Sequence, residues 1–334
     1  MIETKMNVLT DQFGRRHEYL RISITDRCNL RCRYCMPPHG VDLSPKEELL
    51  AFDEIVRLAE IFVGLGIKKI RLTGGEPLVR KGVEKLCARL MGIPGVQTLG
   101  LSTNGVYLVE MAKVLKHSGV EHLNVSLDTL RPDRFQQIAM RRELDSVLRG
   151  IDEAQSVGFP SLKVNTVIMR GFNDDELIDF VEFANAHALN IRFIEYMPFW
   201  GNGWSEVKFL SYRAMKEIIE TKYSLVPVQR NGIIHGPAKE FQVAGGDGII
   251  GFITTMSEHF CADCNRLRLT ADGRFRNCLF ARDTVDLKRL LRAGAARDII
   301  EDSIRAAVLL KWEKHPDARE LIQNQNRPMI AIGG

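Results

Sequence analysis

Two groups of three cysteines are the residues of this chain best suited to chemistry. The first group lies in CNLRCRYCMP, where Cys28, Cys32 and Cys35 follow a C-x3-C-x2-C spacing. Cysteine thiolates hold iron–sulfur clusters, and a [4Fe–4S] cluster usually takes four of them. With three thiolates, one iron keeps an open position for a substrate or cofactor, as catalytic zinc sites do. The alternatives are a zinc ion with a distant fourth ligand and three unligated thiols.

The second group lies in CADCNRLRLTADGRFRNCLF, where Cys261, Cys264 and Cys278 follow a C-x2-C-x13-C spacing. A C-x2-C pair with a distant cysteine ordinarily suggests a zinc ribbon, but a fourth cysteine is missing here as well. His259 lies two residues before Cys261. A zinc site of three cysteines and one histidine is therefore an alternative to an iron–sulfur cluster.

The segment between these cysteines predicts a basic β-hairpin with ADG as its turn. Its arginines alternate along the two strands, at Arg266, Arg268, Arg274 and Arg276. A period of two places Arg266 and Arg268 on one face of the hairpin. Planar guanidinium groups beside an open metal position suit phosphate oxygens. A basic face that contacts only solvent is the alternative.

The elements that must position these residues alternate between strand and helix, which indicates parallel βαβ units. The polar motifs TDRC, TGGEP, STNG and SLD lie at the carboxyl ends of the first four strands, the edge that carries the chemistry in barrels. We therefore expect an α/β fold with an incomplete, TIM-type (β/α)6 barrel rather than a flat, doubly wound sheet. The expected strands are 19–25, 67–73, 96–102, 120–127, 162–169 and 189–197, with helices near 47–65, 81–91, 107–118, 145–157 and 174–188.

The glycine- and aromatic-rich stretch PFWGNGWSE, residues 198–206, marks a boundary after the barrel. Beyond it, the pattern predicts a smaller α+β region, with a helix near 210–221, short strands near 240–255 and 265–277 and a helical segment near 284–314. The expected division is an N-terminal extension over 1–18, the barrel with the first cysteine group over 19–200, and a C-terminal region with the second group over 201–334.

The composition limits the classes of function. Of 334 residues, 45% are hydrophobic and 26% charged, which is ordinary for a globular protein. A formal net charge of +4 is too small to indicate nucleic acid binding by itself. No apolar run approaches the roughly 18 residues of a membrane span, and the N-terminus lacks a signal peptide's apolar core. We therefore expect a cytoplasmic protein with neither membrane nor nucleic acid as a partner. The odd number of cysteines, seven, argues against a disulfide framework, and Cys87 is expected to be a small buried hydrophobe.

The first cysteine loop, followed by Met-Pro, resembles the radical S-adenosylmethionine superfamily. TGGEPL after the second strand is similar to that superfamily's GGE motif, in which glycines let the backbone approach a ligand closely and Glu76 offers an acceptor for an ammonium group. The resemblance implies that the open iron chelates S-adenosylmethionine and that one electron cleaves it to methionine and a 5′-deoxyadenosyl radical. It also implies S-adenosylmethionine contacts at Tyr34, Gly75, Ser126 and Met197. From the residues alone, Ser126 could be a locally satisfied hydroxyl and Met197 a core side chain.

Nearly the whole chain resembles the GTP 3′,8-cyclase family, which catalyses the first step of molybdenum cofactor biosynthesis. The likeness rests on both cysteine groups, on DQFGRRHEYLRISITDRCNLRCRYCMP, on CNRLRLTADG and on the terminal Gly-Gly. It implies that the second group binds a second [4Fe–4S] cluster, which holds the guanine of GTP. It implies GTP contacts at Arg21, Arg71, Ser102, Lys163, Arg266, Leu267 and Arg268. Arg192 is a further candidate from the residues themselves, because a cation on a buried parallel strand needs an anionic partner. The likeness also implies catalytic roles for Cys28, Cys32, Cys35, Arg266 and Arg268, and a tail, Gly333 and Gly334, that reaches the site.

The reaction that this resemblance implies is a lyase reaction on GTP. The radical abstracts the hydrogen from C3′ of the ribose, and the ribose radical attacks C8 of guanine to give (8S)-3′,8-cyclo-7,8-dihydroguanosine 5′-triphosphate. A cyclic pyranopterin monophosphate synthase is the implied downstream partner, and a homodimer is the implied assembly. The sequence identifies no electron donor.

Two other functions compete with this one. A peptide-modifying radical S-adenosylmethionine maturase with an auxiliary cluster would usually need more C-terminal cysteines, and it gives the arginine-rich hairpin no role. A non-enzymatic, metal-binding sensor of nucleic acid would use the 261–280 hairpin, but no aromatic motif interleaves its arginines.

Overall fold

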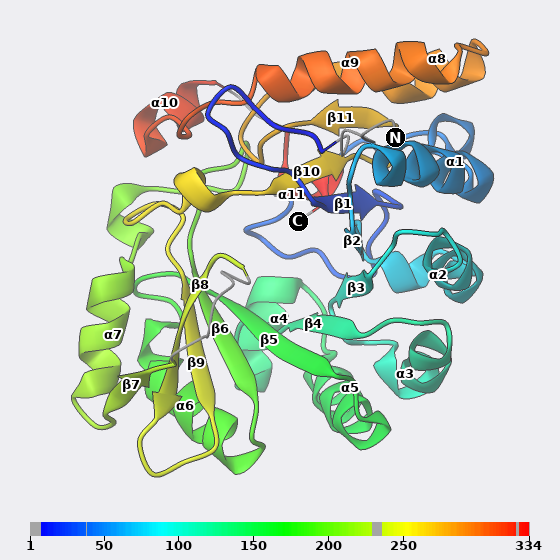
Figure 1. The fold of residues 1–334 in the computed structure, drawn as a ribbon. Helices are drawn as coiled ribbons and strands as arrows, with labels where there is room; N and C mark the ends of the chain where they lie inside the picture. Colours follow the sequence, from blue (N-terminus) through cyan, green and yellow to red (C-terminus); the bar gives the residue numbers. More distant parts are fainter. Residues whose placement is uncertain (1–7, 38, 229–235, 325–326, 334) are drawn as a thin grey trace.

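The computed structural model describes residues 8–37, 39–228, 236–324 and 327–333. Its centre is a run of six parallel strands that pair in the order of the sequence. They are β1 (Tyr19–Ser23), β2 (Lys69–Thr73), β3 (Thr98–Thr103), β4 (His122–Ser126), β5 (Ser161–Ile168) and β6 (Asn190–Glu195). The crossover helices are α1 (Phe52–Gly64), α2 (Val83–Met91), α3 (Leu108–His117), α4 (Pro132–Ala139), α5 (Leu144–Val157) and α6 (Leu177–Ala186). Of these, α1, α2, α3 and α5 lie along the outside of the curved sheet, whereas α4 is seen behind β4 and β5 (Figure 1).

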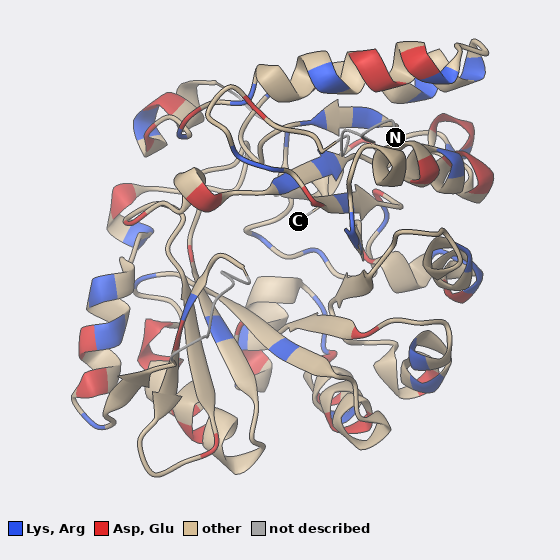
Figure 2. Ribbon diagram, viewed as in Figure 1, with Lys and Arg blue, Asp and Glu red and all other residues tan. Residues whose placement is uncertain are grey.

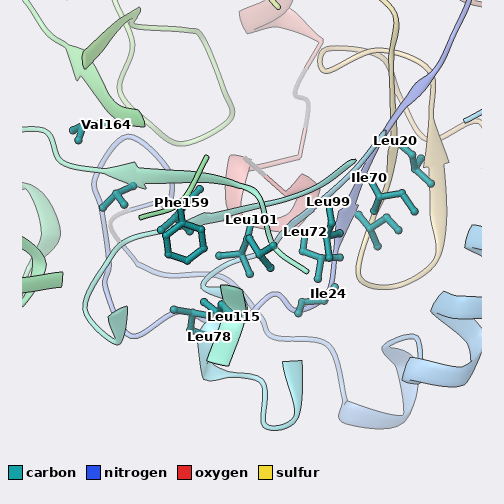
Figure 3. Close-up of a cluster of buried hydrophobic side chains, with 14 of the residues drawn as sticks. Leu20, Ile24, Ile70, Leu72, Leu78, Leu99, Leu101, Leu115, Phe159 and Val164 are labelled. Carbon is teal, nitrogen blue, oxygen red and sulfur yellow. The ribbon is translucent and has the colours of Figure 1, made fainter. Parts of the chain in front are cut away.

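The two faces of the barrel strands differ in polarity, and this alternation creates the site. On β4 the apolar residues Leu123 and Val125 are fully buried in the core, whereas His122, Asn124 and Ser126 line an inner cavity. Side chains alternate between the faces of a strand, so one face packs against the helices while the other stays polar. The buried face continues across neighbouring strands through Leu20, Ile70, Leu72, Leu99 and Leu101 (Figure 3).

The C-terminal region continues the same sheet at both edges of the barrel. At one edge β10 (Arg266–Leu269) pairs parallel with β1, and at the other β9 (Ile249–Ile253) pairs parallel with β6. The twelve strands follow the order β12-β11-β10-β1-β2-β3-β4-β5-β6-β9-β8-β7, so the barrel is open. The remaining strands are β7 (Leu225–Pro227), β8 (Ala238–Val243), β11 (Arg274–Arg276) and β12 (Val285–Asp286).

Five further helices belong to this region, and α8 and α9 lie beside the β10–β11 edge (Figure 1). They are α7 (Tyr212–Glu220), α8 (Leu287–Arg292), α9 (Arg297–Leu309), α10 (Ala318–Gln323) and α11 (Met329–Ile332). Short 3-10 turns cover Lys46–Glu48, Pro77–Val79, Asp174–Glu176, Glu206–Lys208 and Cys261–Asp263.

The structure confirms the incomplete barrel and its six strands, and it corrects two details. The expected helical segment 284–314 is a short strand followed by two helices, because Gly294 takes a left-handed conformation with φ of 72° and ends α8. The helix α4 was not expected, and its sequence PDRFQQIA begins with a proline. Proline is well accepted in the first turn of a helix, where its missing N–H has no helical partner to lose. Within the described ranges, no helix is both long and apolar enough to cross a membrane.

Candidate active site

Both cysteine groups lie on the wall of one cavity of about 320 Å³ inside the barrel. The first group comes from the loop after β1, and the second group flanks the β10–β11 hairpin. Because β10 pairs with β1, the two groups come together although more than 220 residues separate them in the sequence. The cavity is lined by Cys28, Cys32, Cys35, Cys261, Cys264 and Cys278.

The first cysteine loop is held mainly by its backbone. The N–H groups of Arg31 and Arg33 donate to the carbonyls of Ala139 and Ile138 at the end of α4, at 2.9 and 3.1 Å. Burial raises the pKa of Cys28 to about 11, and the nearby Glu76 carboxylate adds to the effect. Burial and the Asp128 carboxylate likewise raise the pKa of Cys32. These thiols would ionise only against a cation, and iron fits that need.

The GGE motif brings its backbone against the cysteine loop. The N–H of Gly75 donates to the carbonyl of Thr25 at 2.7 Å, and the N–H of Glu76 donates to that of Arg27 at 2.8 Å. A Cβ on Gly75 would lie 2.2 Å from the Arg27 carbonyl oxygen, so only glycine fits.

The Glu76 side chain, the expected ammonium acceptor, lines the cavity and also accepts hydrogen bonds from the protein itself. Its carboxylate accepts bonds from the N–H of Leu78, the hydroxyl of Thr103 at 2.8 Å and the N–H of Asn104 at 2.6 Å. Burial raises its pKa to about 7 in spite of these donors. Glu76 therefore ties the loop after β2 to the loop after β3.

The four expected S-adenosylmethionine contacts, Tyr34, Gly75, Ser126 and Met197, all line the cavity. They come from the first cysteine loop and from the carboxyl ends of β2, β4 and β6. Asp128, which sequence reasoning did not single out, also lies here and shares a hydrogen bond with the Tyr34 hydroxyl. Burial raises the pKa of Asp128 to about 6.

The second cysteine group is fixed by two buried cations that sequence reasoning missed. Arg15 donates to the carbonyls of Cys261, Trp312 and Glu313 at 2.7, 2.6 and 2.8 Å, and it pairs with Asp11 at 2.6 Å. It therefore joins the N-terminal segment to the cysteine loop and to the end of α9.

The second cation is Lys311, which is only 2% exposed. Its Nζ lies 3.7 Å from the Cys264 sulfur and donates to the carbonyls of Arg266 and Asn277 at 2.9 and 2.8 Å. Burial raises the pKa of Cys264, but Arg266 and Lys311 outweigh it and lower this pKa to about 6. At neutral pH the second group thus holds a thiolate, the form that binds metal.

The cavity wall between the two groups is strongly basic. Within the described residues it includes seven Lys and Arg side chains and only two carboxylates, Glu76 and Asp128. Lys and Arg bands on β5, β6 and β10 are visible at the centre of the molecule (Figure 2). The cations are Arg21, Lys69, Arg71, Lys163, Arg192, Arg266 and Arg268. Buried cations in such excess need an anionic partner.

The pKa of Tyr19 shows how strongly these cations act inside the cavity. Its hydroxyl lies 2.7 Å from Nε of Arg71. Burial raises its pKa, but Arg71, Arg21 and Lys69 outweigh this and lower it to about 7. Gly100 on β3 makes room for the Arg71 guanidinium, because a Cβ there would lie 2.7 Å from it. A glycine inside a strand was the sequence signal for this close approach.

Most of the expected GTP contacts meet at this wall. Arg21, Arg71, Ser102, Lys163, Arg266 and Arg268 all line the cavity. Leu267 does not, because its side chain is buried in the hydrophobic core on the other face of β10. Arg192 lines the cavity and pairs with Glu240 at 2.6 Å.

The other hairpin arginines do not reach the cavity. Arg274 pairs with Asp286 at 3.2 Å, and Arg276 pairs with Asp283 at 2.7 Å. The expected basic face thus consists of Arg266 and Arg268 alone.

The C-terminal tail enters the barrel. The carbonyl of Gly333 accepts a bond from Arg268 at 2.8 Å, and Gly333 lies against Ser23 and Thr73 at the ends of β1 and β2. The preceding MIAI forms the short helix α11, in which Ile330 and Ile332 are buried. Gly334 lies outside the described residues.

The arrangement of the thiols bears on the two kinds of metal site expected from the sequence. Within the described parts of the chain, no three His, Cys, Asp or Glu side chains are arranged to hold one metal ion. In a [4Fe–4S] cluster each cysteine binds a different iron, so the three sulfurs need not converge on one point. His259, the alternative zinc ligand, lines the cavity and lies edge-on to His315, with ring centroids 5.8 Å apart.

Comparisons with known proteins agree with this geometry. Residues 22–184 match the Radical SAM superfamily, and residues 189–317 match the family Molybdenum Cofactor Synthesis C. The chain is 46% identical over 328 residues to the GTP 3′,8-cyclase of Thermodesulfovibrio yellowstonii. The aligned region covers 98% of this chain and 100% of that protein.

Two further similarities extend the comparison. The chain is 49% identical over 337 residues to molybdenum cofactor biosynthesis protein 1 of Dictyostelium discoideum, covering 99% of this chain but only 53% of the relative, so it spans about half of that protein's length. The chain also resembles the solved structure of Streptococcus suis SuiB, with a TM-score of 0.60 and 15% sequence identity. The match covers 90% of this chain and 69% of the SuiB chain. That likeness shows the fold alone.

Proposed function

The chain belongs to the GTP 3′,8-cyclase family of the radical S-adenosylmethionine superfamily, and from this membership we propose that it converts GTP to (8S)-3′,8-cyclo-7,8-dihydroguanosine 5′-triphosphate. This is the first step of molybdenum cofactor biosynthesis. The observation that carries the proposal is the single cavity on which both cysteine groups and the basic wall meet.

The first site would hold a [4Fe–4S] cluster on Cys28, Cys32 and Cys35. When bound, the cluster and S-adenosylmethionine supply a 5′-deoxyadenosyl radical that abstracts hydrogen. Tyr34, Gly75, Ser126 and Met197 would hold S-adenosylmethionine, with the absent Cβ of Gly75 allowing close backbone packing.

The second site would hold GTP. Cys261, Cys264 and Cys278 would bind a second cluster at the guanine end. The cations Arg21, Arg71, Lys163, Arg266 and Arg268, with the Ser102 hydroxyl, would bind the triphosphate. Leu267 would contribute through its backbone, because its side chain lies in the core. The tail residue Gly333 would contact the same region through Arg268, and Gly334, the other expected tail residue, lies outside the described residues.

The charge distribution orients GTP in one direction. The carboxylates of Glu76 and Asp128 act on the thiols of the first group, whereas Arg266 and Lys311 act on the second. A triphosphate is repelled from the first end and attracted to the basic wall, which leaves the ribose between the two sites. Fixed orientation in a water-excluded cavity directs a reactive radical to one C–H bond.

Other parts of the proposal follow from family membership. We infer a homodimer, a downstream cyclic pyranopterin monophosphate synthase and a cytoplasmic location. We keep the division into a barrel over 19–200 and a C-terminal region over 201–334, although one sheet runs through both.

An anaerobic assay tests the proposal. The protein is reconstituted with iron and sulfide and supplied with dithionite, S-adenosylmethionine and GTP. We expect 5′-deoxyadenosine and the cyclised nucleotide in near-equal amounts. 5′-Deoxyadenosine without consumption of GTP would reject GTP as the substrate, and a protein that binds about one zinc and no iron would reject the radical reaction.

A further inference from the structure

A second cavity, of about 740 Å³, lies on the outer side of the first cysteine loop. Its walls come from that loop, from the end of α4, from the turn between β5 and α6, and from the segment 196–208. Tyr34 lines both this cavity and the active-site cavity. The cysteine loop is therefore the wall that separates the second cavity from the first cysteine group.

The second cavity is basic. Five cations line it, namely Arg31, Arg33, Arg141, Arg170 and Lys208, and no Asp or Glu of the described residues does. Among the ion pairs of the described residues, none involves these five. Arg141 donates to the Met140 carbonyl at 2.8 Å, Arg170 to the Phe209 carbonyl at 3.1 Å and Lys208 to the Gly203 carbonyl at 2.9 Å.

The acidic groups nearby already have partners. Asp175 pairs with Arg131 and Arg134 at 2.8 and 2.6 Å, and neither of these arginines lines the cavity. The described lining itself therefore carries charges of one sign, and Asp174, which accepts the N–H of the lining residue Gly171 at 2.9 Å, is a carboxylate beside it. Such a surface raises the association rate of an acidic partner and makes that rate fall with added salt.

Apolar side chains complete the cavity. Met36, Met140, Met169 and Phe172 contribute to its lining. Met140 is 47% exposed and has φ of 56°, a left-handed conformation that is uncommon outside glycine. This conformation ends α4, where the N–H of Met140 donates to the carbonyl of Gln136. Flexible methionines adapt to a partner's surface.

We propose that this cavity is the docking surface for a small acidic one-electron carrier protein that reduces the first cluster. The inference rests on the proposed function, because cleavage of S-adenosylmethionine consumes one electron per molecule. The carrier loses one electron, and the C5′–S bond breaks. That electron and one from the bond complete the lone pair of methionine sulfur, while the other bond electron stays on C5′. No proton is exchanged.

The position of the surface favours this partner over a small anion. An electron delivered here crosses only the loop that carries Cys28, Cys32 and Cys35. A nucleotide or phosphate held on the outer side of the loop would have no access to the reacting atoms in the barrel.

The test uses the reconstituted full-length protein and two reductants. One is reduced flavodoxin, an acidic carrier protein, and the other is reduced methyl viologen, a small cation. The variant is Arg141→Glu/Arg170→Glu, which leaves the cysteine loop unchanged. Calorimetry measures the affinity of oxidised flavodoxin for the protein before clusters are added, and we expect the variant to bind about tenfold or more weakly. The initial rate of 5′-deoxyadenosine formation by the reconstituted protein is then measured at limiting reductant over a range of salt concentrations.

We expect the variant to be about tenfold or more slower with flavodoxin and unimpaired with methyl viologen. The wild-type rate with flavodoxin falls as salt is added, and the variant loses most of this dependence. Arg57→Glu, on the exposed side of α1 and outside the cavity, is the matched control for a change of surface charge and retains the wild-type rate with both reductants.

Three results overturn the inference. The first is an unchanged rate with flavodoxin, and the second is an equal loss in the Arg57→Glu control. The third is an equal loss with both reductants, which would assign the two arginines to binding of a reactant or to the integrity of the site. A wild-type protein that forms no 5′-deoxyadenosine with methyl viologen would instead reject the proposed function itself.

Discussion

The two cysteine groups have the same number of thiols and share one cavity, yet opposite charges surround them. Beside the first group, Asp128 and Glu76 act with burial to raise thiol pKa values. Beside the second, Arg266 and Lys311 overcome burial and lower the pKa of Cys264 to about 6. Ligand count alone thus does not distinguish the two sites, whereas the charges around them do.

This difference matches two different tasks. Adding an electron to a cluster is harder beside carboxylates and easier beside cations that hydrogen-bond to its sulfurs. The first site is suited to a strongly reducing cluster, which cleavage of a sulfonium requires. Under the proposed function, the second site would hold a less reducing cluster next to an anionic substrate.

The largest expected effect comes from removing a ligand of one group at a time. Cys32→Ser should reduce S-adenosylmethionine cleavage by about a thousandfold or more, because the radical is generated only there. Cys264→Ser should retain uncoupled cleavage and lose GTP turnover. Chromatography of 5′-deoxyadenosine and of GTP checks both variants. Equal loss of cleavage in both variants would contradict a division of tasks between the groups.

Arg268→Ala tests the basic wall without touching either set of thiols. The variant loses the bond to the Gly333 carbonyl and, under the proposed function, the bonds to the triphosphate. A hydrogen bond to a charged group contributes about 1.5–3 kcal/mol, so kcat/KM for GTP should fall roughly 10- to 150-fold while uncoupled cleavage is largely spared. Arg274→Ala, on the same hairpin but paired with Asp286, is the matched control. Native GTP turnover in Arg268→Ala would show that the triphosphate lies elsewhere.

Lys311→Met tests the cationic surroundings of the second group. The variant keeps the length of the side chain and removes the donor to Cys264. Loss of about 1.4 kcal/mol of stabilisation of the reduced form lowers a one-electron potential by about 59 mV. Redox titration followed by electron paramagnetic resonance measures both clusters in the same sample. The first cluster is the internal control, and a shift of both potentials, or of neither, would reject this role for Lys311.

The smallest expected effect concerns pH. With a pKa of about 7, Tyr19 is partly ionised at neutral pH. A bound triphosphate competes for the same cations, so it raises that pKa and GTP binding takes up a proton. The affinity for GTP should therefore fall as pH rises above about 7, by at most about tenfold per pH unit, and this fall should vanish in Tyr19→Phe. Calorimetry in two buffers measures the proton uptake. If the uptake persisted in Tyr19→Phe, its assignment to Tyr19 would be wrong.

Much of the fold can be predicted from short-range patterns in the sequence. The alternation of strands and helices predicted the barrel, and period two on β10 predicted that Arg266 and Arg268 share a face, which places Leu267 on the opposite one. The resemblance to known motifs supplied the candidate residues at the strand ends, because those motifs lie in continuous stretches of sequence.

What the sequence could not reveal depends on contacts between distant segments. Lys311 follows the apolar run AAVLL at the end of α9 and looks like a solvent-facing charge. Its partners, Cys264, Arg266 and Asn277, lie 34 to 47 residues away. Arg15 likewise contacts carbonyls about 250 to 300 residues away. Such contacts have no local periodicity, so only the tertiary structure identifies them.

The pairing of β1 with β10 also has a consequence for how the chain folds. Tyr19 faces Arg266, 247 residues later. At roughly 5–20 residues per second, a ribosome needs about 10 to 50 s to make the intervening chain. During that time one edge of β1 has no strand to pair with, and unpaired edges invite aggregation. A nascent chain that stalls before residue 266 would thus carry most of a barrel with an open side, a natural substrate for chaperones.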